Sequence, residues 1–333
     1  MTRKVRWGIL GVATIGVQKV IPAMQKGDAS EIVAIASRDE SRAKEAASKL
    51  GVPRAYGSYE ELLADAEVEA IYNPLPNHMH LEWSKKAAEA GKHVLCEKPI
   101  GMSVAEAKEL LDVRERTGVK MQEAFMVRTH PQWRSTLERI RSGAIGKLRA
   151  AQGFFSYWNS DPKNIRNILE YGGGSLMDIG CYPITTSRFV FGEEPRRVIS
   201  SMERDPEFKT DCLTSVILEF PSGQATFTCS TQLVPYQRMN FFGADGRLEI
   251  EIPFNAPTDR PCRVFLDDGD LSGKERQTIE FSTCNQYTIQ GDEFSKAILD
   301  DTEVPTPLED AVQNMRVIEA VFRSVESGVW ETP

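Results

Sequence analysis

The stretch Gly8-Ile-Leu-Gly11-Val-Ala13-Thr-Ile-Gly16 joins an apolar run to an amphipathic segment near the N-terminus. Small residues at this spacing, after a strand and before a helix, are typical of the turn that binds the pyrophosphate of a dinucleotide. Gly11 would make the tight turn, Ala13 would let the backbone approach the pyrophosphate, and Gly16 would permit close packing of the helix on the strand. The stretch therefore predicts an N-terminal Rossmann domain, with the first N–H groups of the helix facing the phosphates.

Outward from this stretch, short apolar runs alternate with amphipathic segments as far as Ala124. Strands separated by helices of this length indicate right-handed βαβ crossovers and a parallel sheet. The expected strands are Val5–Leu10, Glu31–Ser37, Ala70–Asn73, His93–Glu97 and Lys120–Ala124. The expected helices are Ile15–Lys26, Glu40–Leu50, Glu60–Leu63, His80–Ala90 and Val104–Thr117.

After residue 147 the pattern changes, because predicted strands follow one another with few helices between them. Pro221-Ser-Gly223 and Ala244-Asp-Gly246 have the chemistry of hairpin turns, so a largely antiparallel sheet is expected. Its strands would be Leu148–Phe155, Ser215–Phe220, Gln224–Thr231, Arg238–Phe242, Arg247–Glu251 and Arg263–Leu266. The helices available to cover one face are Leu176–Phe191, Gln290–Leu299 and Leu308–Val325.

The expected fold class is therefore α/β plus α+β, in two domains. Residues 1–124 would form the Rossmann dinucleotide-binding domain. Residues 125–333 would form a substrate-binding and oligomerisation domain, with an open, mostly antiparallel sheet covered by helices on one face.

The composition excludes several classes of protein. With 333 residues, the chain is longer than a single hydrophobic core usually supports. Its 48 acidic residues outnumber its 40 basic ones, and the net charge of −8 argues against a nucleic-acid-binding surface. The six cysteines include no C-x-x-C pair, so we expect reduced thiols rather than a zinc or dithiol site. Without an apolar leader or a run of about 18 apolar residues, we expect a cytoplasmic protein with no membrane span.

The end of the second predicted strand bears on the choice of cofactor. A domain that selects NAD places Asp or Glu there to hydrogen-bond the ribose 2′-hydroxyl. Here the chain reads Ile35-Ala-Ser37-Arg38-Asp39. The hydroxyl of Ser37 and the guanidinium of Arg38, with Arg42 one helical turn further on, suit a 2′-phosphate. The sequence therefore predicts NADP(H), with the alternative that both arginines are solvated surface residues.

Two later segments carry side chains suited to proton and hydride transfer. Glu97-Lys98-Pro99 ends a predicted strand, which puts Lys98 at the carboxyl edge of the parallel sheet, where such sheets bind ligands. The second segment reads Gly172-Gly-Gly-Ser-Leu-Met-Asp178-Ile-Gly-Cys-Tyr182. Its Asp178 and Tyr182 lie four positions apart, which puts them on one face of a helix. Tyrosine is a poor base at neutral pH unless a nearby cation stabilises its phenolate, and Lys98 can supply one. Taken singly, Asp178 would pass for a surface carboxylate and Tyr182 for a core aromatic residue.

Four segments together carry a family resemblance: the N-terminal fingerprint, Pro74-Leu-Pro-Asn-His-Met-His80, Glu97-Lys98-Pro99, and the segment from Gly172 to Tyr182. In these segments the chain resembles the Gfo/Idh/MocA oxidoreductases. The resemblance implies that Lys98 lies beside the substrate and that the aspartate and tyrosine of the last segment complete the site. The similarity is greatest to the sugar branch, with NADP-dependent D-xylose dehydrogenases, glucose–fructose oxidoreductase and dimeric dihydrodiol dehydrogenase.

The implied reaction is oxidation of an aldose at C1 to its lactone. Tyr182 would take the hydroxyl proton, Lys98 would tune Tyr182, and Asp178 would orient the substrate. An aldose/ketose oxidoreductase with permanently bound NADP(H) and a dihydrodiol dehydrogenase remain alternatives. A nucleotide-sensing regulator without turnover is a further one, although such a protein would be expected to lose the lysine or the tyrosine. The family also implies a homodimer or homotetramer formed through the C-terminal sheet.

The remaining site residues are expected around this centre. The cofactor contacts would be Gly11, Ala13, Thr14, Ile15, Ser37, Arg38, Arg42, Pro74, Leu75, Asn77, His80, Glu97, Lys98 and Arg166. The substrate contacts would be Lys98, Arg128, Trp158, Asp178 and Tyr182, with the alternative that Arg128 ties the two domains together. His78 and His80 form an H-x-H pair, but the chain has four histidines and no carboxylate or cysteine at ligand spacing, so no metal is expected.

Overall fold

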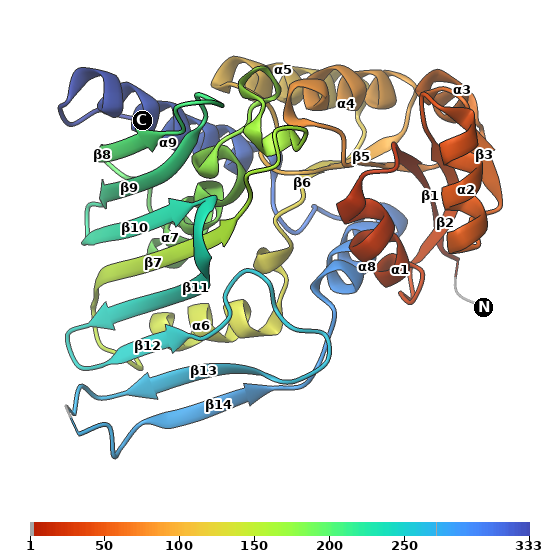
Figure 1. The fold of residues 1–333 in the computed structure, drawn as a ribbon. Helices are drawn as coiled ribbons and strands as arrows, with labels where there is room; N and C mark the ends of the chain where they lie inside the picture. The colour runs from red at the N-terminus through yellow and green to blue at the C-terminus, as the bar shows by residue number, and fades with distance from the viewer. Residues whose placement is uncertain (1–2, 271) are drawn as a thin grey trace. The chain divides into compact units, whose positions relative to one another are not determined.

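The computed structural model describes residues 3–270 and 272–333, and these form two compact units. The first unit contains the chain up to Thr129 together with Asn285–Val312, and the second contains His130–Cys284 and Gln313–Pro333. The expected fold class is confirmed, because the first unit is built on a parallel sheet and the second on a mostly antiparallel one (Figure 1). The units differ from the expected division after residue 124 in that Asn285–Val312 groups with the first unit.

Within the described residues, the first unit contains a six-stranded sheet in the order β3-β2-β1-β4-β5-β6, and all its pairings are parallel. Its strands are β1 (Val5–Leu10), β2 (Ser30–Ala36), β3 (Arg54–Tyr56), β4 (Ala70–Asn73), β5 (His93–Cys96) and β6 (Met121–Glu123). Its helical segments are η1 (Gly16–Val20), α1 (Ile21–Met24), α2 (Glu40–Leu50), α3 (Tyr59–Ala64), η2 (Asn77–Met79), α4 (His80–Glu89), α5 (Val104–Thr117), η3 (Met126–Arg128) and α8 (Gln286–Leu299). Because β1, β4 and β5 are neighbours, the turns that follow these strands share one edge of the sheet.

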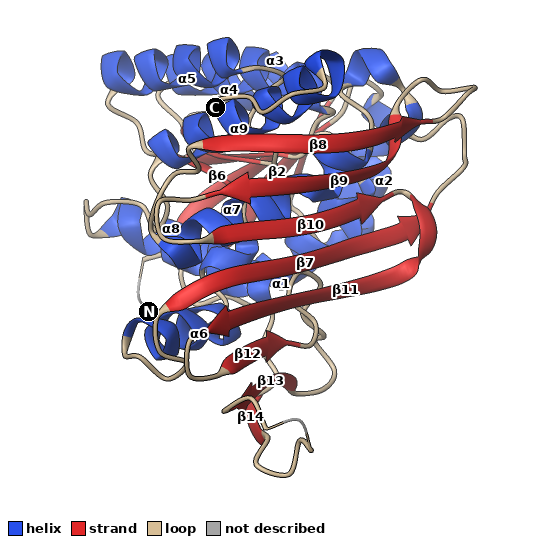
Figure 2. Cartoon of the chain, turned by 90° about the vertical axis from the view of Figure 1, so that its left-hand side faces the viewer, coloured by secondary structure: helices blue, strands red, loops and turns tan. Residues whose placement is uncertain are grey.

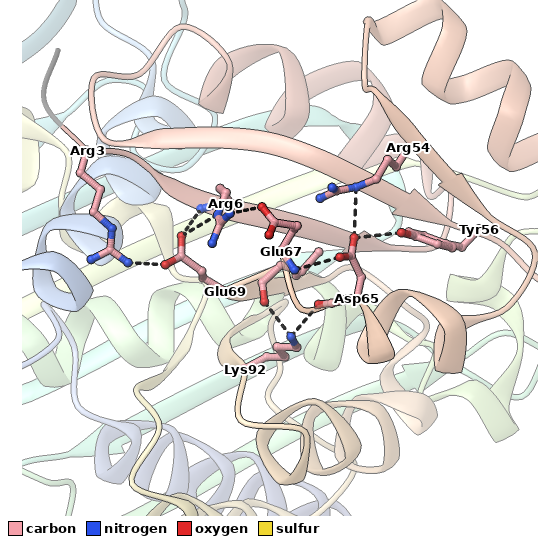
Figure 3. Close-up of polar contacts among 9 residues, drawn as sticks. Arg3, Arg6, Arg54, Tyr56, Asp65, Glu67, Glu69 and Lys92 are labelled. Atoms are coloured by element: carbon pink, nitrogen blue, oxygen red, sulfur yellow. Dashed lines mark hydrogen bonds and ion pairs between the residues drawn. The ribbon is translucent and has the colours of Figure 1, made fainter.

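The opposite edge of this sheet carries a network of ion pairs and hydrogen bonds (Figure 3). Glu69, just before β4, pairs with the guanidinium groups of Arg3 and Arg6. The buried Lys92, just before β5, donates to the carbonyl oxygens of Asp65 and Val68, each at 2.7 Å. These contacts tie the amino ends of the strands together, which leaves the carboxyl edge as the place for ligands.

Helix α8 completes the core of the first unit although it comes from far along the chain. The Trp7 indole of β1 packs against Phe294 with ring centroids 5.6 Å apart and the ring planes tilted by 49°, and its Nε1 donates to Ser295 Oγ at 3.0 Å. The Asp292 carboxylate accepts hydrogen bonds from the backbone N–H groups of Asp28 and Ala29. The expectation that this helix covers the second sheet is therefore wrong, since it packs on the first unit.

The second unit contains, within the described chain, an eight-stranded sheet in the order β14-β13-β12-β11-β7-β10-β9-β8. Only β7 and β10 pair in parallel, and the other pairings are antiparallel. The strands are β7 (Leu148–Trp158), β8 (Arg197–Arg204), β9 (Asp211–Glu219), β10 (Gln224–Ser230), β11 (Gln232–Gly243), β12 (Arg247–Ile250), β13 (Cys262–Asp267) and β14 (Gln277–Phe281). The helical segments are α6 (Pro131–Arg141), η4 (Ile165–Asn167), η5 (Leu169–Tyr171), η6 (Leu176–Gly180), α7 (Cys181–Phe191) and α9 (Leu308–Ser327), of which α9 starts in the first unit.

One face of the second sheet is covered by helices and the other is open (Figure 2). On β9, Thr214, Val216 and Leu218 are buried, whereas the alternate residues Ser215 and Ile217 are exposed. The open face includes a hollow lined by residues of β7, β8, β9, β10 and β11. The single covered face agrees with the sequence-based expectation.

Candidate active site

The turn after β1 is tight. Gly11 has a φ of +82°, which disfavours any residue with a side chain, and its N–H donates to Ala36 O at 2.8 Å. A Cβ at this position would also approach Leu75 Cδ2 to 3.0 Å. Beyond the turn, Ala13, Thr14 and Ile15 remain partly or fully accessible up to the start of η1, a π-helical turn. These features fit the pyrophosphate of a dinucleotide, which approaches backbone N–H groups at a helix start.

Gly16 is less constrained than its place in the fingerprint implies. A Cβ there would meet Pro74 Cγ at 3.6 Å and Tyr72 Cε1 at 3.8 Å, which are ordinary contact distances. At Gly8, inside β1, a Cβ would lie only 2.7 Å from Leu62 Cδ2 of α3. The close packing of helix on strand that we expected at Gly16 is therefore required at Gly8.

The turn after β2 and the first turn of α2 together hold a hydroxyl and two guanidinium groups. Ser37 is buried, and Arg38 and Arg42 are exposed. The acidic residue of this turn, Asp39, is the N-cap of α2 and accepts from the N–H groups of Ser41 and Arg42 at 2.9 and 3.3 Å. Its carboxylate is therefore committed to the helix rather than to a ribose hydroxyl.

Arg38 lies beside the dinucleotide turn. It interacts with the Tyr59 hydroxyl, and this interaction offsets part of the rise in the Tyr59 pKa that burial causes. The same hydroxyl lies 3.5 Å from the position that a Cβ on Gly11 would take. A cation next to the tight turn fits a phosphate on the 2′-oxygen of the adenosine ribose.

His80 connects the loops that follow β4 and β5. Its ring is 1% exposed, with Nδ1 2.7 Å from Pro99 O and Nε2 2.7 Å from Leu75 O. Burial lowers the pKa of His80 to about 4, although both carbonyl contacts act in the opposite direction. A neutral imidazole has one N–H, so one carbonyl accepts a hydrogen bond at neutral pH. The side chain thus fixes the loop that carries Pro74, Leu75 and Asn77 from inside the unit.

Glu97 and Lys98 follow β5 directly. The Glu97 carboxylate accepts from Tyr72 Oη at 2.6 Å, which anchors it to β4, and the backbone N–H of Lys98 lies 3.3 Å from the same carboxylate. Lys98 is half-buried and is joined to Pro99 by a cis peptide bond. Since β1, β4 and β5 are neighbours, Lys98 emerges at the same sheet edge as the dinucleotide turn.

In the second unit, three glycines precede the helix that carries Asp178 and Tyr182. Gly174 has a φ of +117°, and a Cβ there would lie 2.0 Å from Asp211 Oδ1. The buried Asp211 accepts from Ser175 Oγ at 2.6 Å and from the Leu176 N–H at 2.7 Å. Burial raises the pKa of Asp211, and these donors act against the rise. The glycine turn and this buried carboxyl therefore set where the helix begins.

The helix itself is divided into a π-helical turn, η6, and the α-helix α7. Pro183 falls in the first turn of α7, immediately after the change of hydrogen-bond pattern. A proline in the interior of a continuous α-helix would cost about 3 kcal/mol, and the division of the helix places Pro183 near a helix start instead. Single π-helical turns of this kind occur frequently at functional sites.

Tyr182 is 5% exposed and packs among aromatic rings. Its ring centroid lies 5.8 Å from that of Phe155 and 5.4 Å from that of Phe254. Its backbone carbonyl accepts from Thr186 Oγ1 at 2.7 Å. The tyrosine is thus held by packing on both β7 and the segment before β13.

Asp178 lies at the centre of a polar cluster that includes a residue the sequence analysis missed. Tyr157 Oη, from β7, donates to Asp178 Oδ2 at 2.5 Å, and Arg166 Nε lies 2.8 Å from the same oxygen. Burial raises the pKa of Tyr157, and the charge of Asp178 adds to this, so the phenol keeps its proton and acts as a donor. Arg166, which we expected at the cofactor, is therefore paired with the proposed substrate-orienting aspartate.

The two other residues expected to contact the substrate, Trp158 and Arg128, have different surroundings. Trp158 is 63% exposed and directly follows Tyr157 on β7, so the two side chains project to opposite faces of the sheet. Arg128, in the first unit, pairs through Nη1 with Asp310 Oδ2 at 3.3 Å. The structure thus groups Asp178, Arg166 and Tyr182 in the second unit but does not group Trp158 with them.

The comparisons with known proteins agree with this arrangement. The profile described as "Oxidoreductase family, NAD-binding Rossmann fold" matches residues 5–125, and the one described as "GFO/IDH/MocA C-terminal domain" matches residues 133–249. The chain belongs to the Gfo/Idh/MocA oxidoreductase family. Its first unit is accordingly a pyridine-nucleotide-binding Rossmann domain.

Several members of the family are similar over nearly the whole chain. An uncharacterized oxidoreductase of Rhizobium meliloti is 48% identical over 98% of this chain and 99% of its own length. A D-xylose 1-dehydrogenase (NADP(+)) of Haloferax volcanii is 38% identical over 97% and 98%. A 3-ketoreductase from Actinomadura kijaniata, solved with NADP and TDP-benzene, has a TM-score of 0.90 at 28% identity and covers 96% of this chain and 98% of its own.

An aldose-aldose oxidoreductase from Caulobacter crescentus, complexed with glycerol, also has a TM-score of 0.90, at 25% identity over 99% and 100% of the two chains.

Among the residues that the structure describes, no group of three His, Cys, Asp or Glu side chains could hold a metal ion. Over the same residues, no helix is both long and apolar enough to span a membrane.

Proposed function

We propose that this protein is an NADP-dependent sugar dehydrogenase that oxidises an aldose at C1 to its lactone. The observation that carries the proposal is the buried Tyr182, one helical turn after Asp178, in a chain that matches an NADP⁺-dependent D-xylose 1-dehydrogenase over 97% of its length. In the proposed reaction, Tyr182 takes the proton of the sugar hydroxyl, Asp178 orients the substrate and Lys98 lies beside it. When bound, NADP⁺ supplies the acceptor for the hydride that leaves the same carbon.

A further observation supports these roles for the lysine and the tyrosine. The 3-ketoreductase has also been solved as a tyrosine-to-phenylalanine variant and as two variants of one lysine. Its substituted lysine and tyrosine are separated by the same number of positions as Lys98 and Tyr182 here.

The proposed preference for NADP⁺ over NAD⁺ rests on the exposed Arg38 and Arg42 and on the Asp39 carboxylate, which caps its own helix.

The activity is tested by mixing the purified protein with NADP⁺ and a panel of aldoses, and by following NADPH formation by absorbance. We expect turnover with one or more pentoses or hexoses, and lactone as the product. Turnover of a dihydrodiol but of none of the aldoses would favour a dihydrodiol dehydrogenase. A protein purified with tightly bound NADP(H), which exchanges hydride between two sugars, would favour the aldose/ketose oxidoreductase. Nucleotide binding without turnover of any substrate would favour the remaining alternative, a nucleotide-sensing regulator.

The same proposal includes a homodimer or homotetramer formed through the open face of the second sheet. Ile217 and Tyr236 are 36% and 47% exposed beside the hollow on this face, in a region where apolar side chains would gain from burial. We expect light scattering to give a mass of two or four chains, and expect Ile217→Glu to shift it toward one. A monomeric mass for the unsubstituted protein would contradict this part of the proposal.

A further inference from the structure

The polar cluster around Asp178 draws on three elements of the second unit. Tyr157 comes from β7, Arg166 from η4 and Asp178 from η6, and their side chains meet at one carboxylate oxygen. The Asp178 side chain is 12% exposed and that of Arg166 39% exposed, so the pair is shielded from solvent on the aspartate side. An ion pair that is partly buried and hydrogen-bonded has a fixed geometry, unlike most surface pairs.

The cluster also reaches Tyr182. Asp178 and Tyr182 are separated by one helical turn, so the guanidinium that pairs with the carboxylate is held on the side of the helix that carries the phenol. The pKa of Arg166 is raised, first by the charge of Asp178, and further by interactions with the phenols of Tyr157 and Tyr182. Within the second unit, Arg166 is thus a cation that pairs with Asp178 and interacts electrostatically with both tyrosines.

The two tyrosines differ in what they can do. Tyr157 already donates its proton to Asp178, and ionising it would place two negative charges side by side. Tyr182 lies one helical turn after the carboxylate that pairs with Arg166, and its ring packs against Phe155 and Phe254. A cation next to a phenol surrounded by apolar rings stabilises the phenolate, because screening by water is weak there.

We propose that Arg166 is a positioning residue that favours the phenolate form of Tyr182, and that Asp178 and Tyr157 hold its guanidinium in place. This inference rests on the proposed role of Tyr182 as the base. It gives Arg166 a part that we expected for Lys98, and it gives Asp178 a second part besides orienting the substrate. Arg166 belongs to the same unit as Tyr182, so its effect is built into the second unit itself.

The direct test is the ultraviolet absorbance of the Tyr182 phenolate, taken as the difference between the protein and its Tyr182→Phe variant across pH. In Arg166→Gln we expect the midpoint of phenolate formation to move to higher pH by about one unit. Arg166→Lys, which keeps the charge, should move it less, and Tyr157→Phe should move it in the same direction by a smaller amount. In parallel, the rising limb of kcat/KM with pH should move with the midpoint, which is roughly a tenfold loss at a fixed pH below it.

Arg247→Gln is the matched control. Arg247 also pairs with a shielded carboxylate of the second unit, since its Nη2 lies 2.7 Å from Asp267 Oδ2 and the two side chains are 35% and 8% exposed. This variant should leave the phenolate midpoint unchanged, which separates loss of an ion pair from loss of the charge beside Tyr182. A midpoint that moves equally in Arg247→Gln would overturn the proposal.

The remaining outcomes are distinct. A phenolate midpoint that stays in place in Arg166→Gln, with weaker NADP⁺ binding, would make Arg166 a cofactor residue and our inference wrong. A midpoint that stays in place with unchanged NADP⁺ binding would also overturn it. A midpoint that moves as expected in a protein that turns over no aldose would support the role of Arg166 and contradict only the proposed function.

Discussion

Two segments of the molecule have the same succession of structural elements but different proposed roles. The segment from Gly11 to Met24 and the segment from Gly172 to Phe191 each start with a glycine turn of positive φ. Each continues into a five-residue π-helical turn, and each then enters an α-helix with a proline within its first three positions. In the first segment, accessible backbone N–H groups at the helix start are proposed to bind the cofactor. In the second, the buried side chains on the helix are proposed to do the chemistry.

The difference lies in what is packed under each turn. A Cβ on Gly11 would meet an apolar side chain, Leu75, whereas a Cβ on Gly174 would collide with the Asp211 carboxylate that caps the helix. A turn whose backbone N–H groups bind a ligand needs only to be accessible and correctly shaped. A turn that positions side chains must also be held in place, and the second turn is held by the buried Asp211 carboxyl.

The largest effect should follow from removing the proposed base in the second segment. We expect Tyr182→Phe to lower kcat by roughly two to four orders of magnitude, which is the range for losing a general base. Nucleotide affinity should barely change, because Tyr182 belongs to the other unit. Lys98→Met should be comparably severe, and the double variant should be little worse than either single one. Steady-state kinetics and nucleotide titrations measure all three.

The competing assignment makes Lys98 the proton acceptor and leaves Tyr182 only to bind the sugar. It predicts that Tyr182→Phe raises KM, preserves kcat and keeps the pH profile in place. A preserved kcat would therefore remove Tyr182 from the chemical step, and the two helix starts would then both act only in binding.

Glycine-to-alanine changes compare the two turns directly. Gly174→Ala should destabilise the protein by about 3 kcal/mol or more, because it combines a strained φ with a collision against Asp211. The matched change in the first segment is Gly16→Ala, which meets only ordinary contacts and should leave stability within about 1 kcal/mol. Thermal unfolding of the two variants measures this. Equal losses would show that Asp211 does not fix the second turn.

The smallest of these effects concerns the cofactor. We expect Arg38→Ala to weaken NADP⁺ by roughly ten- to a hundredfold, as for the loss of a charge-assisted hydrogen bond, and to leave NAD⁺ nearly unchanged. The ratio of kcat/KM for the two nucleotides measures the selectivity. An unsubstituted protein that uses NAD⁺ as well as NADP⁺ would contradict the preference.

Much of the fold could be predicted because local signals mark its elements. The helix from Val104 to Thr117 is bounded by Ser103, which caps its first turn, and by Gly118 in the left-handed region, and both signals are visible in the sequence. Strand β3 was missed because it has three residues, and β8 and β14 because their polar residues weaken the apolar alternation. Helix α6 was missed although Pro131 at its first position is a helix-start signal.

The site was harder to predict, because its partners come from distant segments. Asp178 and Tyr182 could be identified from their spacing on one helix, but that spacing does not show what else contacts them. In the aromatic run ending at Trp158, we expected Trp158 at the substrate, whereas the alternation of the strand brings Tyr157 to Asp178. A burial pattern along β7 would have been the signal, and it depends on which face of the sheet is covered.

The position of α8 in the chain has a consequence for biosynthesis. The parallel sheet with its dinucleotide turn is translated first, but Phe294 and Ser295 of α8, which contact Trp7, are translated only after the second sheet. Domains form in the order in which their parts leave the ribosome. The nascent parallel sheet therefore lacks these two contacts to Trp7 until the whole second sheet has been made. Maturation of the nucleotide-binding unit is in this way coupled to synthesis of the second unit's sheet.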